Sequence, residues 1–169
     1  MSDVDSYRFL DFTTRAIMKA WAKRDARAKQ TIPWTPMARR LDESKVALVS
    51  TAGVARIDDI PFDQKGENQN PWWGDPTHRV IPRESTEKDV KLYHMHIDCE
   101  TGEKDLDVFL PLRRLDDLVN DGIVGESAES HYSIMGYQLC TEVLENKTAP
   151  AMLSQLKSEK VDAVVLIPA

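Results

Sequence analysis

Three segments of the chain space their apolar residues about one helical turn apart, with polar residues between them. The first covers residues 5–28 and carries Lys and Arg toward its C-terminal end, where basic side chains suit the helix dipole. The second covers residues 110–122, with Gly122 at a helix-ending position, and the third covers residues 150–160, with Pro150 at a helix-opening position. The pattern therefore predicts three helices.

Three other segments have the patterns of β-strands. Residues 45–51 form an apolar run rich in β-branched residues, which predicts a strand buried on both faces, and residues 161–168 repeat this pattern. Residues 89–98 alternate apolar and polar side chains, which predicts a strand with one polar face. Because strands and helices alternate along the chain, we predict an α/β fold with a mainly parallel open sheet and flanking helices.

Proline-rich segments separate these elements. Two prolines prevent a helix over residues 31–40 and predict an extended arm there. Residues 60–82 hold four prolines and two glycines, which predicts a long irregular loop of a kind that is often functional. We therefore predict two parts, an N-terminal helix and arm over residues 1–44 and an α/β domain over residues 45–169.

The composition limits what the protein can bind. Its 169 residues include 22 Lys and Arg against 28 Asp and Glu, a formal net charge of −6, which argues against nucleic acids or anionic membranes as partners. The N-terminus lacks the basic and apolar regions of a secretion signal, and no segment has the roughly 20 apolar residues of a membrane span. We therefore expect a cytoplasmic protein that binds a small molecule or another protein chain.

Seven segments follow the order and approximate spacing of a known enzyme family. They are VALVSTAGV (46–54), PFD (61–63), GDPTHRVIP (74–82), HMHID (94–98), FLPLRRLDDLVNDGIVG (109–125), HYSIMGY (131–137) and VDAVVLIP (161–168). An ordered run of seven segments is far more specific than any one of them. In these segments the chain resembles the N-terminal half of the selenoprotein B family of glycine, sarcosine, betaine and D-proline reductases.

The resemblance implies an oxidoreductase, or a subunit of one, that acts on a small amino-acid-derived substrate. In that family a selenolate or thiolate attacks the α-carbon of the substrate and expels the amine, commonly with help from a separate pyruvoyl-containing subunit. The redox-active segment of the family would follow residues 161–168, and the sequence ends at Ala169. Three explanations are compatible with the missing segment: the protein is naturally short, its second half is a separate chain, or its second half was removed.

Two histidines and a carboxylate share one face of the strand predicted over residues 89–98. His94, His96 and Asp98 follow one another at every second position, so on a strand they project from one face in steps of about 7 Å. Together with His131 they could bind a divalent metal, form a metal-free acid/base cluster at the substrate, or pair with one another for structural reasons. The spacing leaves all three interpretations open, and no other cofactor is clearly encoded.

Two candidate substrate contacts lie near predicted strand ends and in the long loop. Thr51 and Gly53 follow the first strand, where open α/β sheets bind ligands, and a glycine turn can present backbone N–H groups to a carboxylate. The alternative is that Gly53 only makes the turn. His78 and Arg79 are the second candidate, since Arg is a natural bidentate partner for a carboxylate, and the alternative is an Arg salt bridge that ties down the loop.

Further candidates come from the sixth family segment and from the cysteines. His131 and Tyr132 can exchange protons with a substrate and Gly136 permits close backbone approach, although a structural role fits equally well. Cys99 lies at a predicted strand end and could replace the missing nucleophile, but a neighbouring carboxylate raises the pKa of a thiol and makes it less reactive. Cys140 is the weaker candidate of the two.

Three functions fit these observations. The first is a reductase-family subunit that binds a small amino-acid-derived substrate, for reductive C–N cleavage with a partner that supplies the thiol or selenol. The second is a metal-dependent small-molecule enzyme that uses His94, His96, Asp98 and His131. The third is a non-catalytic binding or scaffolding subunit whose apolar last strand pairs with another chain or makes a homo-oligomer. The resemblance favours the first.

Overall fold

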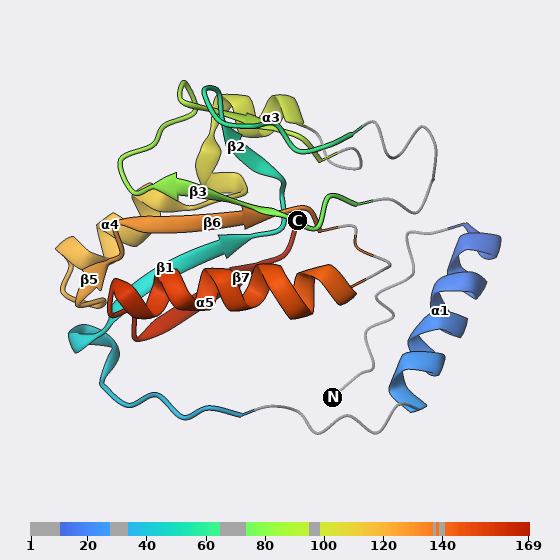
Figure 1. Cartoon of the computed structure of the whole chain (residues 1–169), viewed down its shortest axis with the longest axis horizontal. Coiled ribbons are helices and arrows are strands. Elements are labelled where there is room, and N and C mark those ends of the chain that lie inside the picture. The colour runs from blue at the N-terminus through green and yellow to red at the C-terminus, as the bar shows by residue number, and fades with distance from the viewer. Residues whose placement is uncertain (1–10, 28–33, 65–73, 95–98, 137, 139–140) are drawn as a thin grey trace. The chain divides into compact units, whose positions relative to one another are not determined.

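The structure is a computed structural model, and Figure 1 shows the whole chain. It describes residues 11–27, 34–64, 74–94, 99–136, 138 and 141–169. The chain divides into two compact units, residues 1–36 and 37–169. None of the described helices is long and apolar enough to cross a membrane.

The first unit contains one described helix, α1 (Phe12–Arg27), which confirms the prediction of a helix over that range. Asp11 caps it, because its carboxylate accepts hydrogen bonds from the backbone N–H groups of Thr13 and Thr14 at 3.0 and 3.1 Å. The Thr13 hydroxyl also donates to this carboxylate, and these hydrogen bonds hold the pKa of Asp11 well below its ordinary value.

The second unit contains the remaining helices and all of the described strands. The strands are β1 (Lys45–Ser50), β2 (Val54–Arg56), β3 (His78–Pro82), β4 (Val90–Leu92), β5 (Glu126–Ser127), β6 (Ser130–Ile134) and β7 (Ala163–Ile167). The α-helices are α3 (Cys99–Lys104), α4 (Leu112–Asn120) and α5 (Ala149–Ser158). Short 3₁₀ turns cover Leu41–Glu43 and Leu106–Val108, and one π-helical stretch, Leu144–Thr148, leads into α5.

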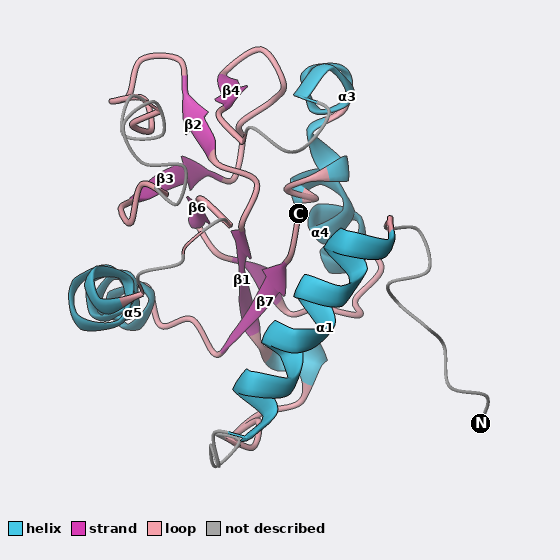
Figure 2. Ribbon diagram, turned by 90° about the vertical axis from the view of Figure 1, so that its right-hand side faces the viewer, coloured by secondary structure: helices cyan, strands magenta, loops and turns pink. Residues whose placement is uncertain are grey.

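The main sheet is built around β1, as the sequence predicted for an α/β fold. β7 pairs in parallel with Val46–Ser50 of β1 on one side, while β5 and β6 pair in parallel with the beginning and the end of β1 on the other. β3 is antiparallel to β6 and forms the opposite edge of the sheet. Figure 2 shows β3, β6, β1 and β7 in this order, with α5 on one side of the sheet and α4 on the other.

The prediction for residues 89–98 was wrong about the sheet to which they belong. Only β4 is a strand among the described residues of this range, and it pairs antiparallel with β2 in a separate two-stranded sheet. Side chains alternate in burial, but the buried side is the one predicted to be polar: Val90, Leu92 and His94 are buried, while Lys91 is exposed and Tyr93 is partly exposed. Alternation does not say which strand will be the neighbour, and residues 95–98 lie outside the described residues.

Two other predictions need correction. The predicted loop over residues 60–82 contains β3, whose Arg79 and Ile81 are buried, and the segment from His131 forms most of β6, for which no strand was predicted. The last strand, β7, forms as predicted but is not buried, since Val164, Val165 and Leu166 are 38%, 48% and 73% exposed. Among the described residues it pairs with β1 on one side only, so an apolar sequence does not by itself mean that a strand is buried on both faces.

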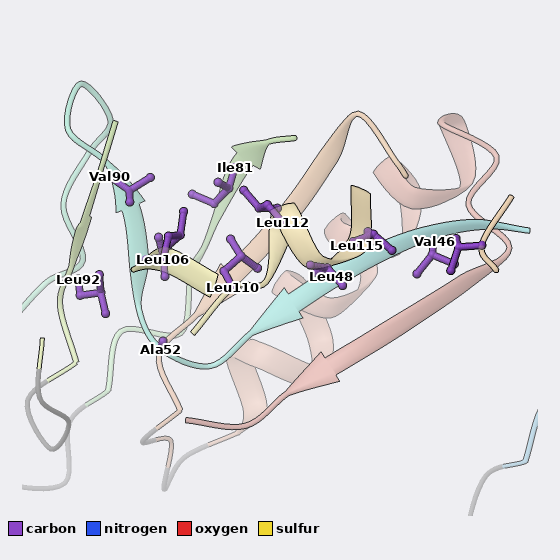
Figure 3. Close-up of a cluster of buried hydrophobic side chains, with 12 residues drawn as sticks. Val46, Leu48, Ala52, Ile81, Val90, Leu92, Leu106, Leu110, Leu112 and Leu115 are labelled. Atoms are coloured by element: carbon purple, nitrogen blue, oxygen red, sulfur yellow. The ribbon is translucent and has the colours of Figure 1, made fainter. Parts of the chain in front are cut away.

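The apolar core lies on both faces of β1. On the α4 side, side chains of β1, β3, β4 and α4 surround the fully buried Ile81 and Leu110, as Figure 3 shows. On the α5 side, Met152 and Leu156 of α5 pack against Ala47, Val49 and Tyr132. Full burial of one such aliphatic side chain stabilises the fold by about 1.5–3 kcal/mol, so these faces hold the carboxyl ends of the strands in place.

Candidate functional site

The carboxyl ends of β1, β6 and β7 meet at one edge of the main sheet, and the segments after them are joined by hydrogen bonds. The N–H of Thr51 donates to Ile167 at 3.0 Å, and the N–H of Gly53 donates to Ile134 at 3.0 Å. A Cβ on Gly136 would lie 3.0 Å from the Thr51 Oγ1, so a larger residue would require Thr51 to shift by a few tenths of an ångström. Thr51, Gly53 and Gly136 are therefore brought together, although the sequence analysis had not linked Gly136 to the other two.

Each backbone N–H of the turn at Gly53, residues 51–54, donates a hydrogen bond within the protein. Gly53 has a φ of 64°, in the left-handed region that glycine adopts without strain. Besides the two bonds above, the N–H of Ala52 donates to the Ser50 hydroxyl at 3.2 Å and that of Val54 to the Ser133 hydroxyl at 2.8 Å. The turn thus has no free N–H for a carboxylate, and the alternative interpretation, that Gly53 makes the turn, accounts for its geometry.

His94 and Cys99 lie beside this turn. The N–H of Tyr93 donates to the Gly53 carbonyl at 2.9 Å, and a Cβ on Gly53 would lie 3.4 Å from the backbone nitrogen of His94. The Cys99 Sγ donates to the His94 carbonyl at 3.3 Å. His94 is buried and Cys99 is half-buried, so the Cys99 thiol is the more accessible of these two groups.

His131 lies inside the sheet, at the gap between β5 and β6. Its Nδ1 accepts a hydrogen bond from the N–H of Leu48 in β1 at 3.0 Å, and its Nε2 lies 3.3 Å from the Ser127 Oγ. Because Nδ1 accepts, Nε2 carries the proton and donates to Ser127. The ring is fully buried, and this burial lowers its pKa to about 4. Both ring nitrogens are thus used within the sheet, away from the carboxyl edge.

Tyr132 points to the opposite face, under α5. It is fully buried, burial raises its pKa to about 12, and its hydroxyl has no hydrogen-bond partner among the described residues. The ring of His78 lies 6.0 Å from that of Tyr132, centroid to centroid. His78 is opposite Ile134, the last residue of β6, so it belongs to the carboxyl edge. Partial burial lowers the pKa of His78 and favours its neutral form.

Arg79 holds a segment that we call the strap, residues 60–64, along β3. Its Nε and Nη2 donate to the carbonyls of Ile60 and Pro61 at 2.6 and 3.0 Å, while Nη1 donates to the Thr77 hydroxyl and the His78 carbonyl. Its guanidinium also stacks on the Phe62 ring, 4.2 Å from the centroid. All three guanidinium nitrogens are thus engaged, and Arg79 is placed as a clamp rather than as an open carboxylate receptor.

Asp75 completes the attachment of the strap. Its carboxylate accepts from the N–H of Asp63 at 2.8 Å and from the N–H of Thr77 at 2.9 Å, and one oxygen lies 3.7 Å from the Arg79 Nη2. Asp75 is buried, so it also compensates the buried charge of Arg79. The strap is therefore held in a definite position at the rim of the carboxyl edge.

Two cavities flank the strap. The first, of about 440 Å³, lies along β3 and is lined by Asp59, Ile60, Pro61, Asp63, Asp75, Thr77, His78, Arg79 and Val80. The second, of about 540 Å³, is lined by Pro61, Phe62, Asp63, Gln64 and Tyr93. Both fall in the range of small-molecule sites. The second cavity borders the residues next to His94, which places it beside the Gly53 turn.

The structure brings some of the predicted site residues together and not others. The carboxyl edge collects Thr51, Gly53, His78, His94, Cys99 and Gly136. His131 and Tyr132 lie within the two cores, while His96, Asp98 and Cys140 lie outside the described residues. No group of three or more His, Cys, Asp or Glu that could hold a metal occurs among the residues that the structure describes.

The sequence analysis did not single out Phe62, Asp75 or Tyr93, which shape the strap and the second cavity. Phe62 and Asp75 lie within the family segments PFD and GDPTHRVIP, so their presence there was an available signal. Tyr93 stands on the apolar side of the alternating pattern, where it looked like a core residue. Its half-exposed ring instead meets Phe62 edge to face, with ring centroids 6.2 Å apart.

Comparison with known proteins shows the family of the chain. Residues 21–169 match the family model described as glycine/sarcosine/betaine reductase selenoprotein B. The chain is also 31% identical over 133 residues to the D-proline reductase subunit gamma of Acetoanaerobium sticklandii, a match that covers 79% of this chain and 52% of that relative. The chain thus spans about half the length of this relative, and no solved structure matches it. The chain belongs to the glycine/sarcosine/betaine reductase selenoprotein B family.

Proposed function

We propose that this chain is a reductase subunit that binds a small amino-acid-derived substrate in the second cavity, between the strap and Tyr93. The proposal rests on where the family segments lie in the folded chain. Family segments that are far apart in the sequence, around residues 46–54, 61–63, 74–82 and 131–136, converge on one edge of the sheet. Open α/β sheets bind their ligands at the carboxyl ends of the strands, where this edge lies.

The lining of the second cavity suits a small zwitterion. Asp63 supplies a carboxylate that attracts a substrate ammonium, while the Tyr93 ring and Pro61 supply apolar surface for its carbon atoms. Lys91 lies over the Tyr93 ring, with its Nζ 5.8 Å from the centroid, and adds a positive charge that attracts a substrate carboxylate. The volume of about 540 Å³ is large enough for an amino acid together with a reacting group from a partner.

The reaction that we propose is reductive cleavage of the C–N bond with a partner subunit. A thiolate or selenolate of the partner attacks the α-carbon of the substrate and forms a C–S or C–Se bond. The C–N bond breaks, and the amine leaves with the bonding electron pair and takes up a proton. One thiol of a dithiol reductant then attacks the sulfur or selenium, the C–S or C–Se bond breaks, and the carbon keeps the bonding pair and takes up a proton. The second thiol resolves the mixed disulfide or selenosulfide, so the dithiol ends as a disulfide and the thiolate or selenolate is regenerated. The present chain holds the substrate in the second cavity, between the strap and Tyr93, where the partner's thiolate or selenolate reaches its α-carbon.

Ligand-observed NMR titration with D-proline, glycine and betaine tests the binding step. Tyr93→Ala removes one wall of the second cavity, and we expect it to raise the dissociation constant of the bound probe at least about tenfold, the loss of about 1.4 kcal/mol. Ile123→Ala is the matched control, because Ile123 is also partly exposed but lines a separate cavity near Gly122. It should leave the dissociation constant unchanged.

Two outcomes would contradict the proposal. The first is that none of the three probes binds even at concentrations of about 10 mM, well above the usual substrate range. The second is that Tyr93→Ala and Ile123→Ala weaken binding equally, which would mean that the second cavity is not the site. Circular dichroism of both variants confirms that any loss of binding does not come from unfolding.

A further inference from the structure

The outer side of β7 is an apolar sheet edge that nothing covers among the described residues of the second unit. Val164, Val165 and Leu166 are 38%, 48% and 73% exposed. Ala163 and Ile167 pack on the α4 side of the sheet, so Val165 points to that side and Val164 and Leu166 point to the α5 side. Apolar side chains are thus exposed on both faces of this edge strand.

The opposite edge strand of the same sheet, β3, is attached to another segment of the chain. There the strap runs along β3, and the guanidinium of Arg79 fixes it through the carbonyls of Ile60 and Pro61. β7 has no comparable cover among the described residues, and its five residues include no charge, proline or glycine that would discourage pairing. β3 thus has a segment attached to it and β7 has none among the described residues, so β7 is the edge available for pairing.

The backbone of β7 has its free hydrogen-bonding groups at two positions. The carbonyl of Ile167 accepts from Thr51, so it points toward β1. Because neighbouring residues of a strand point their N–H and C=O groups to opposite sides, Ala163 and Val165 also face β1, while Val164 and Leu166 face outward. The outer side thus offers two N–H donors and two C=O acceptors, separated by Val165.

We propose that β7 pairs antiparallel with β7 of a second copy of this chain, about a two-fold axis at Val165. In this register Val164 of one copy lies opposite Leu166 of the other, and the outward groups of these residues satisfy one another in four hydrogen bonds. Val165 lies opposite its own copy as a non-hydrogen-bonded pair. All outward donors and acceptors of the strand are thus used, so the edge is self-complementary, as a two-fold interface requires.

Side-chain size and charge agree with this register. The large Leu166 meets the smaller Val164 of the partner copy, and Ile167 meets the small Ala163, so the larger side chains do not face one another. Asp162 lies opposite Pro168, which has no N–H and ends the pairing, and no two like charges face each other. The inference does not depend on the proposed function, because it uses only the sheet edge away from the strap.

The association should be weak. Pairing of one five-residue strand covers less than the roughly 1,200–2,000 Å² of a standard stable interface. We therefore expect a monomer–dimer equilibrium with a dissociation constant in the micromolar range or above. Sedimentation velocity of the full chain from about 1 to about 300 μM would bracket this range.

The sharpest test introduces a charge at the two-fold axis. Val165→Lys and Val165→Glu each place two like charges opposite one another, and each should raise the dissociation constant at least about tenfold. An equimolar mixture of the two variants pairs Lys with Glu and should restore the dimer. Leu153→Lys is the matched control, because Leu153 is 50% exposed on α5 and should leave association unchanged.

A covalent test does not depend on affinity. A non-hydrogen-bonded antiparallel pair has its Cα atoms about 4.5 Å apart, a separation that a disulfide can span. Val165→Cys should therefore form a disulfide-linked dimer on mild oxidation, and Leu153→Cys and the unchanged chain should not. A wild-type chain that stays monomeric at all concentrations, or a Lys/Glu mixture that stays monomeric, would overturn the proposal.

Discussion

The buried ring of His131 leads to a prediction about acid stability. In the folded protein its pKa is about 4, whereas an exposed histidine of the unfolded chain titrates near the ordinary value of 6.5. Between these values the unfolded chain binds a proton that the folded protein does not. The stabilisation is therefore fully present above pH 6.5 and is lost as the pH falls toward 4.

The size of this loss follows from the two pKa values. A shift of one unit corresponds to 1.36 kcal/mol, so the free energy of unfolding should fall by about 3 kcal/mol between pH 7 and pH 4 from His131 alone. Burial is the main cause of the shift, and the nearby charges of Glu159 and Arg83 act in opposite directions on it. Carboxylates with lowered pKa values, such as Asp42, add their own loss at still lower pH.

The variant His131→Asn isolates this contribution. Its side-chain oxygen can still accept the N–H of Leu48, but it does not titrate, and the lost ring volume should destabilise the protein by about 2 kcal/mol at pH 7. Because the wild-type protein then loses about 3 kcal/mol on acidification, the two proteins should reverse their order of stability near pH 4 to 5.

Urea unfolding followed by circular dichroism at several pH values between 4 and 7 measures both proteins. The reasoning would be refuted by a difference in unfolding free energy that stays constant over this pH range. A constant difference would mean that His131 has the same pKa in the folded and unfolded states, and hence that its nitrogens are not sequestered in the sheet.

Two further substitutions test the clamp and a helix end. Arg79→Lys retains the charge but not the guanidinium contacts to Ile60 and Pro61, so urea unfolding should show a loss of about 2–4 kcal/mol, and a loss below about 0.5 kcal/mol would exclude the clamp. Lys160 lies just after the C-cap residue of α5 with a φ of 58°, so Lys160→Gly should stabilise the protein by about 1 kcal/mol in thermal unfolding. Lys157→Gly, inside the same helix, should instead destabilise it by about 1 kcal/mol, and equal signs for the two would contradict this account.

Local pattern in the sequence was sufficient for several elements. β1, α4 and α5 appear where periodicity and end signals placed them, because the burial of one helix face or of a whole strand leaves a regular mark in the sequence. The seven family segments likewise identified the family, because their order along the chain can be read without any knowledge of the fold. The sequence by itself therefore determined the fold class and the family.

Tertiary structure alone decided the partners of the strands and the roles of several polar residues. β6 carries Ser130, His131 and Ser133, which made it look like a site rather than a strand. Their polarity is compatible with the interior because β1 supplies Leu48 and Ser50 as hydrogen-bond partners from about 80 residues away. Whether a polar group is a reactive group or a satisfied core group depends on such distant partners, and local periodicity carries no information about them.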